Sequence, residues 1–258
     1  MNLQGKVAIV TGAGGTGSGR AIARRLAREG AKIVVADIDE RGGNETVSSI
    51  ESERGTAVFL RTDVRVESEV SALVNFAVQH FGGLDVLVND ASSKTFPEKS
   101  LDDWFVNVQV DLLGAMYATR HAIEAMRKLR GGAIVNIRST SALPHGGPSK
   151  APGYDTAKAG ILRLTTCLAP LAAENIRVNC LVPDWIASDD VRAYWEKLTL
   201  EQRREDDAPE RLTTLDEIAD AVLALITDES LAGRVMVWWS DGEPRLIPFG
   251  DAGYVRLE

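Results

Sequence analysis

The stretch Thr11-Gly12-Ala13-Gly14-Gly15-Thr16-Gly17-Ser18-Gly19-Arg20 decides the fold of this chain. It follows an apolar run at 7–11 that predicts a buried strand, and it opens an amphipathic run at 18–30 that predicts a helix. Gly12, Gly14 and Gly17 match the G-x-G-x-x-G spacing of a dinucleotide-binding turn. Glycines let the backbone approach a pyrophosphate, and a helix N-terminus offers free N–H groups and a positive dipole end. The stretch therefore predicts a strand, a phosphate-binding turn and a helix in succession.

Asp37 lies about 20 residues beyond Gly17, at the end of the next predicted strand, 32–37. A carboxylate in this place is positioned to accept hydrogen bonds from the ribose of adenosine. Its charge would repel the 2′-phosphate of NADP, so we expect NAD as the cofactor. The alternative interpretation is a tight turn beside a solvated aspartate.

Short β-branched runs alternate with amphipathic segments along the rest of the chain. Strands that alternate with helices predict βαβ units, and near-continuous Val, Ile and Leu predict a parallel sheet covered on both faces. The expected strands are 7–11, 32–37, 57–60, 86–89, 133–137, 177–182 and 235–239, and the expected helices are 18–30, 41–53, 67–81, 102–128, 154–173 and 215–227. The fold class is therefore α/β, with a doubly wound parallel sheet of seven strands.

Residues 184–211 interrupt this alternation, because they are charged, carry aromatic side chains and lie between a predicted strand and a predicted helix. A long connection in a compact domain is often a functional lid. No change in composition and no linker rich in Pro, Gly or Ser divides the chain. We therefore expect one dinucleotide-binding and catalytic domain over residues 1–258, with a lid insertion at about 184–211.

Composition and charge exclude several classes of protein. The 258 residues are 45% hydrophobic and 26% charged, which is typical of a globular protein. A net charge of −8 provides no basic surplus for nucleic acid, and no apolar run reaches the ~18 residues of a membrane-spanning helix. The N-terminal residues show no secretory signal. The 2 cysteines predict no disulfide framework, and no residues have metal-ligand spacing, so we expect a cytoplasmic protein without a metal.

Tyr154 and Lys158 are four positions apart at the start of a predicted helix, so they share one face of it. A phenol has a pKa of about 10 and is a poor base at neutral pH. A neighbouring ammonium group and the N-terminal dipole of a helix both favour the phenolate. Such a tyrosine can exchange a proton with an alcohol or carbonyl oxygen while a hydride moves. By itself, the pair is also compatible with a surface pair that has no function.

Several motifs occur in one order along the chain. They are the glycine-rich turn with Asp37, Asp63-Val64, Asn89-Asp90-Ala91, Asn136-Ile137-Arg138-Ser139, Tyr154-x-x-x-Lys158 and Ile176-Arg177-Val178-Asn179-Cys180-x-x-Pro183. In this order the chain resembles the short-chain dehydrogenase/reductase family over nearly its whole length. The resemblance implies a Rossmann-type sheet, a nicotinamide cofactor and a Ser–Tyr–Lys site supported by an Asn. It also implies a homotetramer or homodimer built on the predicted helices 102–128 and 154–173.

The resemblance further implies roles for single residues. Tyr154 would be the general acid/base, Lys158 would favour its phenolate, and Ser139 would hydrogen-bond the reacting oxygen. The implied cofactor-binding residues are Gly12, Thr16, Gly17, Ser18 and Gly19 at the turn, Asp37 at the ribose, Asp63 and Val64 at the adenine, Asn89 and Ala91 along the cleft, Lys158 at the nicotinamide ribose, and Ile186 and Ser188 at the carboxamide. We therefore expect an NAD(H)-dependent oxidoreductase that interconverts a small-molecule secondary alcohol and a ketone.

The sequence departs from the family pattern at several of these positions. The glycine-rich turn is one residue longer than usual, Asn89-Asp90-Ala91-Ser92 replaces Asn-Asn-Ala-Gly, and Pro183-Asp184 replaces Pro-Gly. Asp111 replaces the supporting Asn, which in the family acts largely through a backbone carbonyl that holds a water beside the lysine. An aspartate can keep that role, but its charge could also raise the pKa of Lys158 and weaken the effect of Lys158 on the tyrosine. These departures support a second hypothesis, a cofactor-binding pseudoenzyme or regulatory subunit.

Two serines compete for the catalytic position. The usual family spacing to the tyrosine points to Ser141, whereas alignment on the strand end Asn-Ile-x-Ser points to Ser139 with an insertion in the loop 144–148. Strand ends are fixed in geometry while loops absorb insertions, so Ser139 is the preferred assignment.

Overall fold

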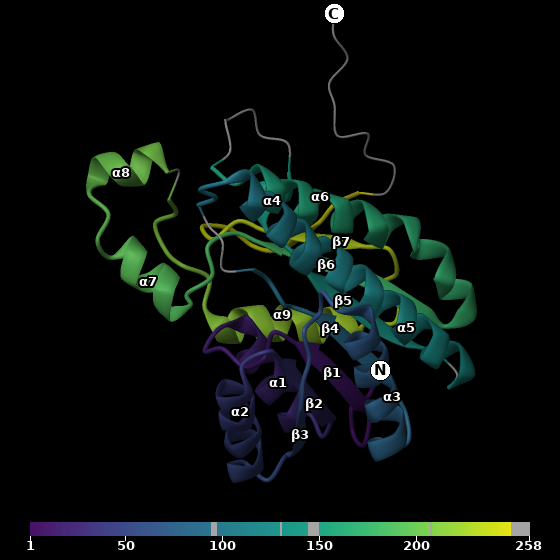
Figure 1. The fold of residues 1–258 in the computed structure, drawn as a ribbon. Coiled ribbons are helices and arrows are strands. Elements are labelled where there is room, and N and C mark those ends of the chain that lie inside the picture. Colours follow the sequence, from purple (N-terminus) through teal and green to yellow (C-terminus); the bar gives the residue numbers. More distant parts are fainter. Residues whose placement is uncertain (94–96, 130, 144–149, 207, 249–258) are drawn as a thin grey trace, which may run out of the picture.

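One sheet of eight strands lies at the centre of the part of the chain that the structure describes (Figure 1). The computed structural model describes residues 1–93, 97–129, 131–143, 150–206 and 208–248. The strands are β1 (Val7–Thr11), β2 (Lys32–Asp37), β3 (Thr56–Arg61), β4 (Val86–Asn89), β5 (Gly132–Ile137), β6 (Ile176–Pro183), β7 (Val235–Trp238) and β8 (Arg245–Leu246). Their order is β3-β2-β1-β4-β5-β6-β7-β8, and all pairs from β3 to β7 are parallel. The prediction of a doubly wound, Rossmann-type α/β fold is confirmed.

The predicted count of seven strands is wrong by one, because β8 adds an antiparallel edge. Met236 of β7 pairs with Leu246 of β8, and Val237 pairs with Arg245. A strand of two residues is too short to show a hydrophobic period in the sequence. The seven predicted strands correspond to β1–β7.

Helices cover both faces of the sheet. They are α1 (Ser18–Arg28), α2 (Glu40–Ser52), α3 (Glu67–Phe81), α4 (Leu101–Asn107), α5 (Ala115–Lys128), α6 (Pro152–Cys167), α7 (Asp189–Trp195), α8 (Leu200–Glu205) and α9 (Leu215–Thr227). Alternate strand residues face opposite layers. Ala8 and Val10 pack with α1, α2 and α9, whereas Val7 and Ile9 pack with α3 and α5. Among the described residues, no helix is both long enough and apolar enough to cross a membrane.

The predicted helix 102–128 is interrupted by a π-helix, Val108–Gly114, between α4 and α5. Asp111 on this π-helix is completely buried. Gly114 packs so closely on Val64 that a Cβ atom on Gly114 would lie 2.7 Å from Val64 Cγ2. π-Segments often occur at functional positions, and a hydrophobic period does not reveal them.

The predicted helix 154–173 ends earlier, because α6 stops at Cys167 and a 3₁₀ segment, Ala169–Glu174, follows. Pro170 lies in that segment and has no N–H group to donate to a preceding carbonyl. The proline therefore explains why the α-helix does not continue.

β2 and β3 lie on one side of β1, and β4 and the later strands lie on its other side. The order of the strands in the sheet therefore reverses between the neighbours β1 and β4. At this edge, Thr11 of β1 lies beside Asn89 of β4, and Asn89 lies beside Asn136 of β5. Ligands of open α/β sheets bind outside the carboxyl ends of the strands at such a switch point. The glycine-rich turn, Asp90 and Ser139 all follow directly from these strand ends.

Candidate active site

Lys158 of α6 and Asp111 of the π-helix form a buried ion pair at the carboxyl ends of the strands. Lys158 Nζ lies 2.7 Å from Asp111 Oδ1, and both side chains are almost completely buried. The Ser92 hydroxyl donates to Asp111 Oδ1 at 2.5 Å, and the Ser93 N–H donates to Oδ2 at 3.0 Å. The side chain of Asp111, and not only its backbone, is therefore used to hold the lysine.

Burial and charge act in opposite directions on this pair. Burial lowers the pKa of Lys158, but the charges of Asp111 and Tyr154 outweigh it, so that the pKa is raised above its ordinary value. Burial raises the pKa of Asp111, but the Lys158 charge and the hydrogen bonds from Ser92 and Ser93 bring it below its ordinary value. Both groups are therefore charged at neutral pH.

Tyr154 lies one helical turn before Lys158 on α6. Lys158 Nζ lies 4.8 Å from the centroid of the Tyr154 ring. The N-terminus of α6 lacks a side-chain hydrogen bond from its N-cap residue, Ala151. Glu98 takes over this role, because its carboxylate accepts the N–H of Tyr154 at 2.8 Å and that of Gly153 at 3.1 Å. Sequence analysis missed Glu98 because it lies far from α6 in the chain.

Ser139 directly follows Arg138 at the end of β5 and begins a 3₁₀ turn, Thr140–Ala142, that packs against α6. Its Oγ accepts the N–H of Ser141 at 3.3 Å. Thr140 donates to Asp184 Oδ1 at 3.1 Å, so Asp184 anchors this turn to the end of β6. Ser141 Oγ is buried and has no hydrogen-bond partner among the described residues. The predicted insertion at 144–148 lies outside the described residues.

The glycine-rich turn lies against the segment that follows β4. Gly12 has φ of +72°, and a Cβ atom there would lie 2.6 Å from Ala91 Cα, so the position requires glycine. The Gly14 N–H donates to Asp37 Oδ2 at 2.8 Å, and a Cβ atom on Gly14 would lie 2.7 Å from Asp37 Cγ. At Gly17 the space is open, with no atom within 4 Å of the Cβ position. The turn is thus closely packed at Gly12 and Gly14, whereas space is left beside Gly17, directly before α1.

Asp90 occupies the N-terminus of α1. Its carboxyl group accepts hydrogen bonds from the Ser18 hydroxyl, at 2.9 Å to Oδ2, and from the Gly19 N–H. Burial raises the pKa of Asp90 to about 7, although the Ser18 hydrogen bond and the charges of Lys158 and Arg138 act to lower it. A carboxyl group that is partly protonated at neutral pH therefore lies where the sequence predicts a phosphate.

Comparison with known proteins identifies the family. A family model described as enoyl-(acyl carrier protein) reductase matches residues 12–238. An uncharacterized oxidoreductase of Thermotoga maritima is 41% identical over 206 residues, which are 78% of this chain and 77% of that protein. The chain belongs to the short-chain dehydrogenase/reductase family. It is thus related to a family of oxidoreductases, as its motifs predict.

Two further members of the short-chain dehydrogenase/reductase family are similar over most of their length. Xanthoxin dehydrogenase of Arabidopsis thaliana is 35% identical over 251 residues, covering 89% of this chain and 86% of that protein. The structure of a 7α-hydroxysteroid dehydrogenase complexed with NADH and 7-oxo glycochenodeoxycholic acid superposes with a TM-score of 0.82 at 31% identity. That superposition covers 93% of this chain and 95% of the dehydrogenase.

The side chain of Asn89 is buried and joins elements of the fold. Asn89 is expected to line the cofactor cleft, but its side chain is 2% exposed. Its Nδ2 donates to Asn136 Oδ1 at 2.8 Å and to Thr119 Oγ1 at 3.1 Å. The Asn89 side chain therefore joins β4 to β5 and α5, and only its backbone is left to face a cleft.

The remaining predicted cofactor residues follow the ends of β3 and β6. After β3, Asp63 pairs with Arg65 at 2.6 Å, which holds the pKa of the Asp63 carboxyl below its usual range. Beyond β6, Ile186 forms a bridge with Thr213, and Ser188 precedes α7. Among the described residues, no group of three or more His, Cys, Asp and Glu side chains could hold a metal ion.

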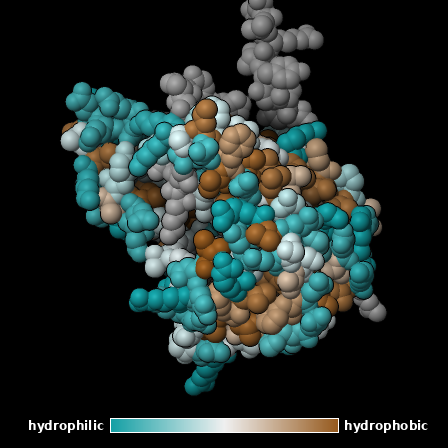
Figure 2. Space-filling model, in the orientation of Figure 1, coloured by the Kyte–Doolittle hydropathy of each residue, from teal (hydrophilic) through white to brown (hydrophobic). Residues whose placement is uncertain are grey.

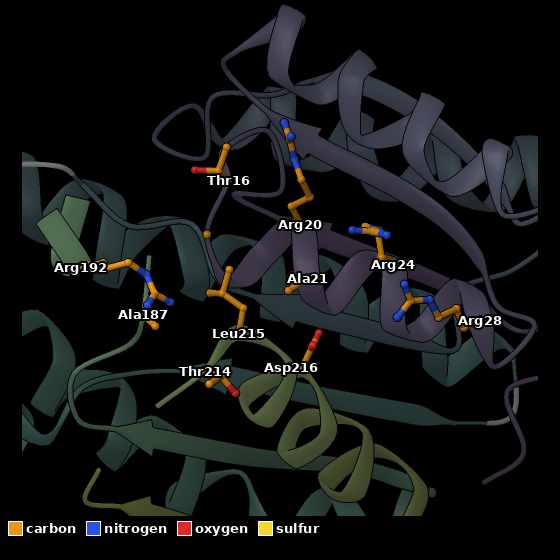
Figure 3. A pocket seen from close by; sticks show the side chains of 11 residues that line it. Thr16, Arg20, Ala21, Arg24, Arg28, Ala187, Arg192, Thr214, Leu215 and Asp216 are labelled. Atoms are coloured by element: carbon orange, nitrogen blue, oxygen red, sulfur yellow. The ribbon is translucent and has the colours of Figure 1, made fainter. Parts of the chain in front are cut away.

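The segment 184–211 borders the glycine-rich turn. Thr16 Oγ1 donates to Oδ2 of Asp189, the first residue of α7, at 2.7 Å. Neither α7 nor α8 has a buried residue, and both helices project from the rest of the molecule (Figure 1). A hollow of about 280 Å³ lies where α1, α9 and this segment meet (Figure 3). Its lining includes Thr16, Gly17, Arg20, Arg24, Arg28, Ala187, Arg192 and Thr214.

Proposed function

We propose that this short-chain dehydrogenase/reductase uses NAD(H) to interconvert a secondary alcohol and a ketone, with Tyr154 as the general acid/base. The observation that carries the proposal is the arrangement of Tyr154, Lys158 and Asp111 on adjoining helices at the switch point of the sheet. Ser139 lies at the end of β5, on a turn that packs against the same helix α6. A phenol, a cation and a hydroxyl group on neighbouring elements at the carboxyl ends of the strands can form a proton-transfer site.

The glycine-rich turn fits a dinucleotide. Gly12 and Gly14 leave no room for a Cβ atom, whereas Gly17 opens toward the N-terminus of α1. These glycines and Thr16 would hold the pyrophosphate, and Asp37 would hold the adenosine ribose. For Ser18 and Gly19 to join them, their hydrogen bonds to Asp90 would have to be exchanged for bonds to the phosphate. The complex of the related 7α-hydroxysteroid dehydrogenase with NADH supports this assignment. When bound, the nicotinamide would accept or donate the hydride.

The side chains of the chain itself would move the proton. In alcohol oxidation the Tyr154 phenolate oxygen accepts the proton of the substrate hydroxyl group, and in ketone reduction the phenol returns it. The Ser139 hydroxyl donates a hydrogen bond to the same substrate oxygen. Lys158, fixed by Asp111, places a positive charge beside the tyrosine ring.

Replacement of the tyrosine tests the mechanism. Tyr154→Phe removes the proton-transferring oxygen and should lower turnover by about 10²–10⁴-fold. NADH binding, followed by fluorescence, should not change, because the ring and the cofactor-binding residues remain. Tyr117→Phe on α5 is the matched control and should keep full activity. Full activity of Tyr154→Phe would contradict the proposal, and NADH binding without turnover of any secondary alcohol by the native protein would favour a pseudoenzyme.

Cofactor preference follows from Asp37, whose carboxylate is fixed by the N–H groups of Gly14 and Asp39. Because this anion would face a 2′-phosphate, NADH should bind at least about tenfold more tightly than NADPH, or ~1.4 kcal/mol. Fluorescence titration of both cofactors measures the ratio. Asp37→Asn keeps an acceptor for Gly14 and should reduce the preference. Tighter binding of NADPH by the native protein would contradict the assignment.

We also propose that the chain forms one domain that is cytoplasmic, with 184–211 as a lid, and that it assembles as a homodimer or homotetramer. Leu101, Trp104 and Phe105 of α4 are exposed apolar residues, which supports a contact with a second copy. Figure 2 shows hydrophobic patches across the body of the molecule, whereas the projecting segment at the left is mostly hydrophilic. Substrate identity is to be tested with a panel of secondary alcohols and NAD, followed by absorbance.

A further inference from the structure

Arg138 is a buried cation whose side chain has no hydrogen-bond partner in the part of the chain that the structure describes. It directly follows β5 and is 3% exposed, and its N–H donates to the carbonyl of Leu181 on β6 at 2.8 Å. Its Nε, Nη1 and Nη2 atoms are buried, and none has a hydrogen-bond partner within the described ranges. Buried charges are normally paired, because leaving water without compensation costs free energy. The guanidinium of Arg138, unpaired among the residues that the structure describes, therefore costs free energy in the folded protein, which suggests that it has a function.

The Arg138 side chain lies on the sheet face that α6 covers. Asn136, two residues earlier, donates to Thr165 of α6 at 3.0 Å, and alternate residues of a strand share a face. The charged and titratable groups that act on Arg138 come from every neighbouring element. They are Asp90 after β4, Asp111 on the π-helix, Tyr154 and Lys158 on α6, and Cys180 on β6. Arg138 therefore lies on the α6 side of the sheet, where its charge acts together with those of Tyr154, Lys158 and Asp111.

Lys158 and Arg138, two cations near Tyr154, differ in how much of their charge a neighbouring carboxylate offsets. Lys158 has a carboxylate oxygen 2.7 Å from its Nζ, so Asp111 offsets part of its field at Tyr154. Arg138 forms no ion pair among the described residues, and a guanidinium keeps its charge in proteins. Asp90 opposes Arg138 only to the extent that its partly protonated carboxyl group is ionised. Arg138 therefore adds a buried positive charge that no ion pair among the described residues offsets.

We propose that Arg138 is a positioning residue that stabilises the Tyr154 phenolate together with Lys158, whose charge Asp111 partly offsets. The inference rests on the proposed role of Tyr154. It also explains how the site tolerates an aspartate at position 111. A second cation compensates for the carboxylate, so the environment of the tyrosine keeps a positive charge.

The pH at which Tyr154 ionises tests the proposal without cofactor or substrate. The chain has 4 tyrosines, so subtracting the ultraviolet absorbance titration of Tyr154→Phe isolates the phenolate signal of Tyr154. For the variant Arg138→Met, the reference is the double variant Arg138→Met/Tyr154→Phe. The midpoint of the Tyr154 titration in Arg138→Met should lie at least about one pH unit above that of the native protein. Arg138→Lys keeps the charge and should restore most of the native midpoint.

Arg177→Met is the matched control, because Arg177 is also buried but donates to carbonyl groups on the opposite side of β6, including that of Asp228 at 2.8 Å. Arg177→Met should lower the stability of the protein and leave the midpoint of the Tyr154 titration unchanged. An unchanged midpoint in Arg138→Met, or an equal shift in Arg138→Lys and Arg138→Met, would overturn the proposal. Turnover by Tyr154→Phe would instead contradict the proposed function and leave this titration interpretable.

Discussion

Hydroxyl groups accompany three of the carboxylates that surround the site. Ser18 donates to Asp90, Ser92 donates to Asp111, and Thr140 donates to Asp184. Each of these aspartates stands where the family pattern has a neutral residue. A buried carboxylate is tolerated only when donors compensate for lost hydration, so each substitution is integrated into its surroundings.

Among these carboxylates, Asp90 should make stability depend on pH. Its pKa is raised by burial to about 7 in the folded protein, whereas an unfolded Asp titrates near 3.8. Folding therefore favours the protonated form, and stability is lost as the pH rises from about 4 through 7. Asp90→Asn removes this cost and should raise the free energy of unfolding at pH 8 by about 1–2 kcal/mol, with little gain at pH 4. Thermal or urea unfolding at both pH values measures the difference.

Asp190→Asn on the exposed surface of α7 removes the same charge and serves as the control. Because that side chain is exposed, Asp190→Asn should not give the stability gain at pH 8 that is expected of Asp90→Asn. A gain of the same size at pH 4 and pH 8 in Asp90→Asn would show that the carboxyl group of Asp90 does not titrate in this range.

At the scale of single elements, Glu98 links the loop after β4 to the N-terminus of α6. Glu98→Ala leaves the N–H groups of Gly153 and Tyr154 without their acceptor and should cost about 1–2 kcal/mol of stability. Because Tyr154 lies in that first turn, turnover should fall as well. Glu98→Gln keeps one acceptor oxygen and should lie between the native protein and Glu98→Ala in both measurements.

Thr214→Ala provides a comparison, since it removes the side chain that caps α9 through the N–H of Glu217. It should lower stability by a similar amount and leave kcat unchanged. Equal kcat values for Glu98→Ala and the native protein would show that the cap has no role in placing Tyr154.

Hydrophobic periodicity predicted the long elements well. β1 and β2 follow from short, continuous apolar runs that are buried on both faces, and α1 follows from buried residues that recur at the helical period. The π-helix could not be predicted in this way, since it depends on a buried Asp111 and on the close contact of Gly114 with Val64. Such contacts join residues far apart in the chain, and local patterns do not contain them.

At the scale of the whole molecule, the order of the motifs predicted where the site forms, but not how each side chain points. Tyr154 and Lys158 share a face because of helix geometry alone. The inward direction of Asn89 and the capping role of Glu98 depend on contacts across the fold. Arg138 was visible in a motif, yet its burial and missing partners could be seen only in the structure.

The segment 184–211 should be the first described part of the chain to open. α7 and α8 lack buried residues, so little apolar contact holds them to the sheet. Limited trypsin digestion should cut after Arg203 and Arg204 before it cuts after Arg163 of α6. If the segment closes over the cofactor as proposed, NADH should slow the cuts in α8.

Mass spectrometry of the early fragments identifies the sites. The cut after Arg163 serves as the internal control for general unfolding. Cleavage at Arg163 as early as at Arg203 would contradict a separately opening segment, and equal rates with and without NADH would contradict its role as a lid.

The short strand β8 also limits how copies of the protein can associate. It runs antiparallel to β7 and covers part of the edge of a strand that contains Val235 and Val237. An uncovered apolar edge is a template for pairing with strands of another chain. A truncation that removes β8 should therefore increase aggregation, while assembly through the helices would remain possible.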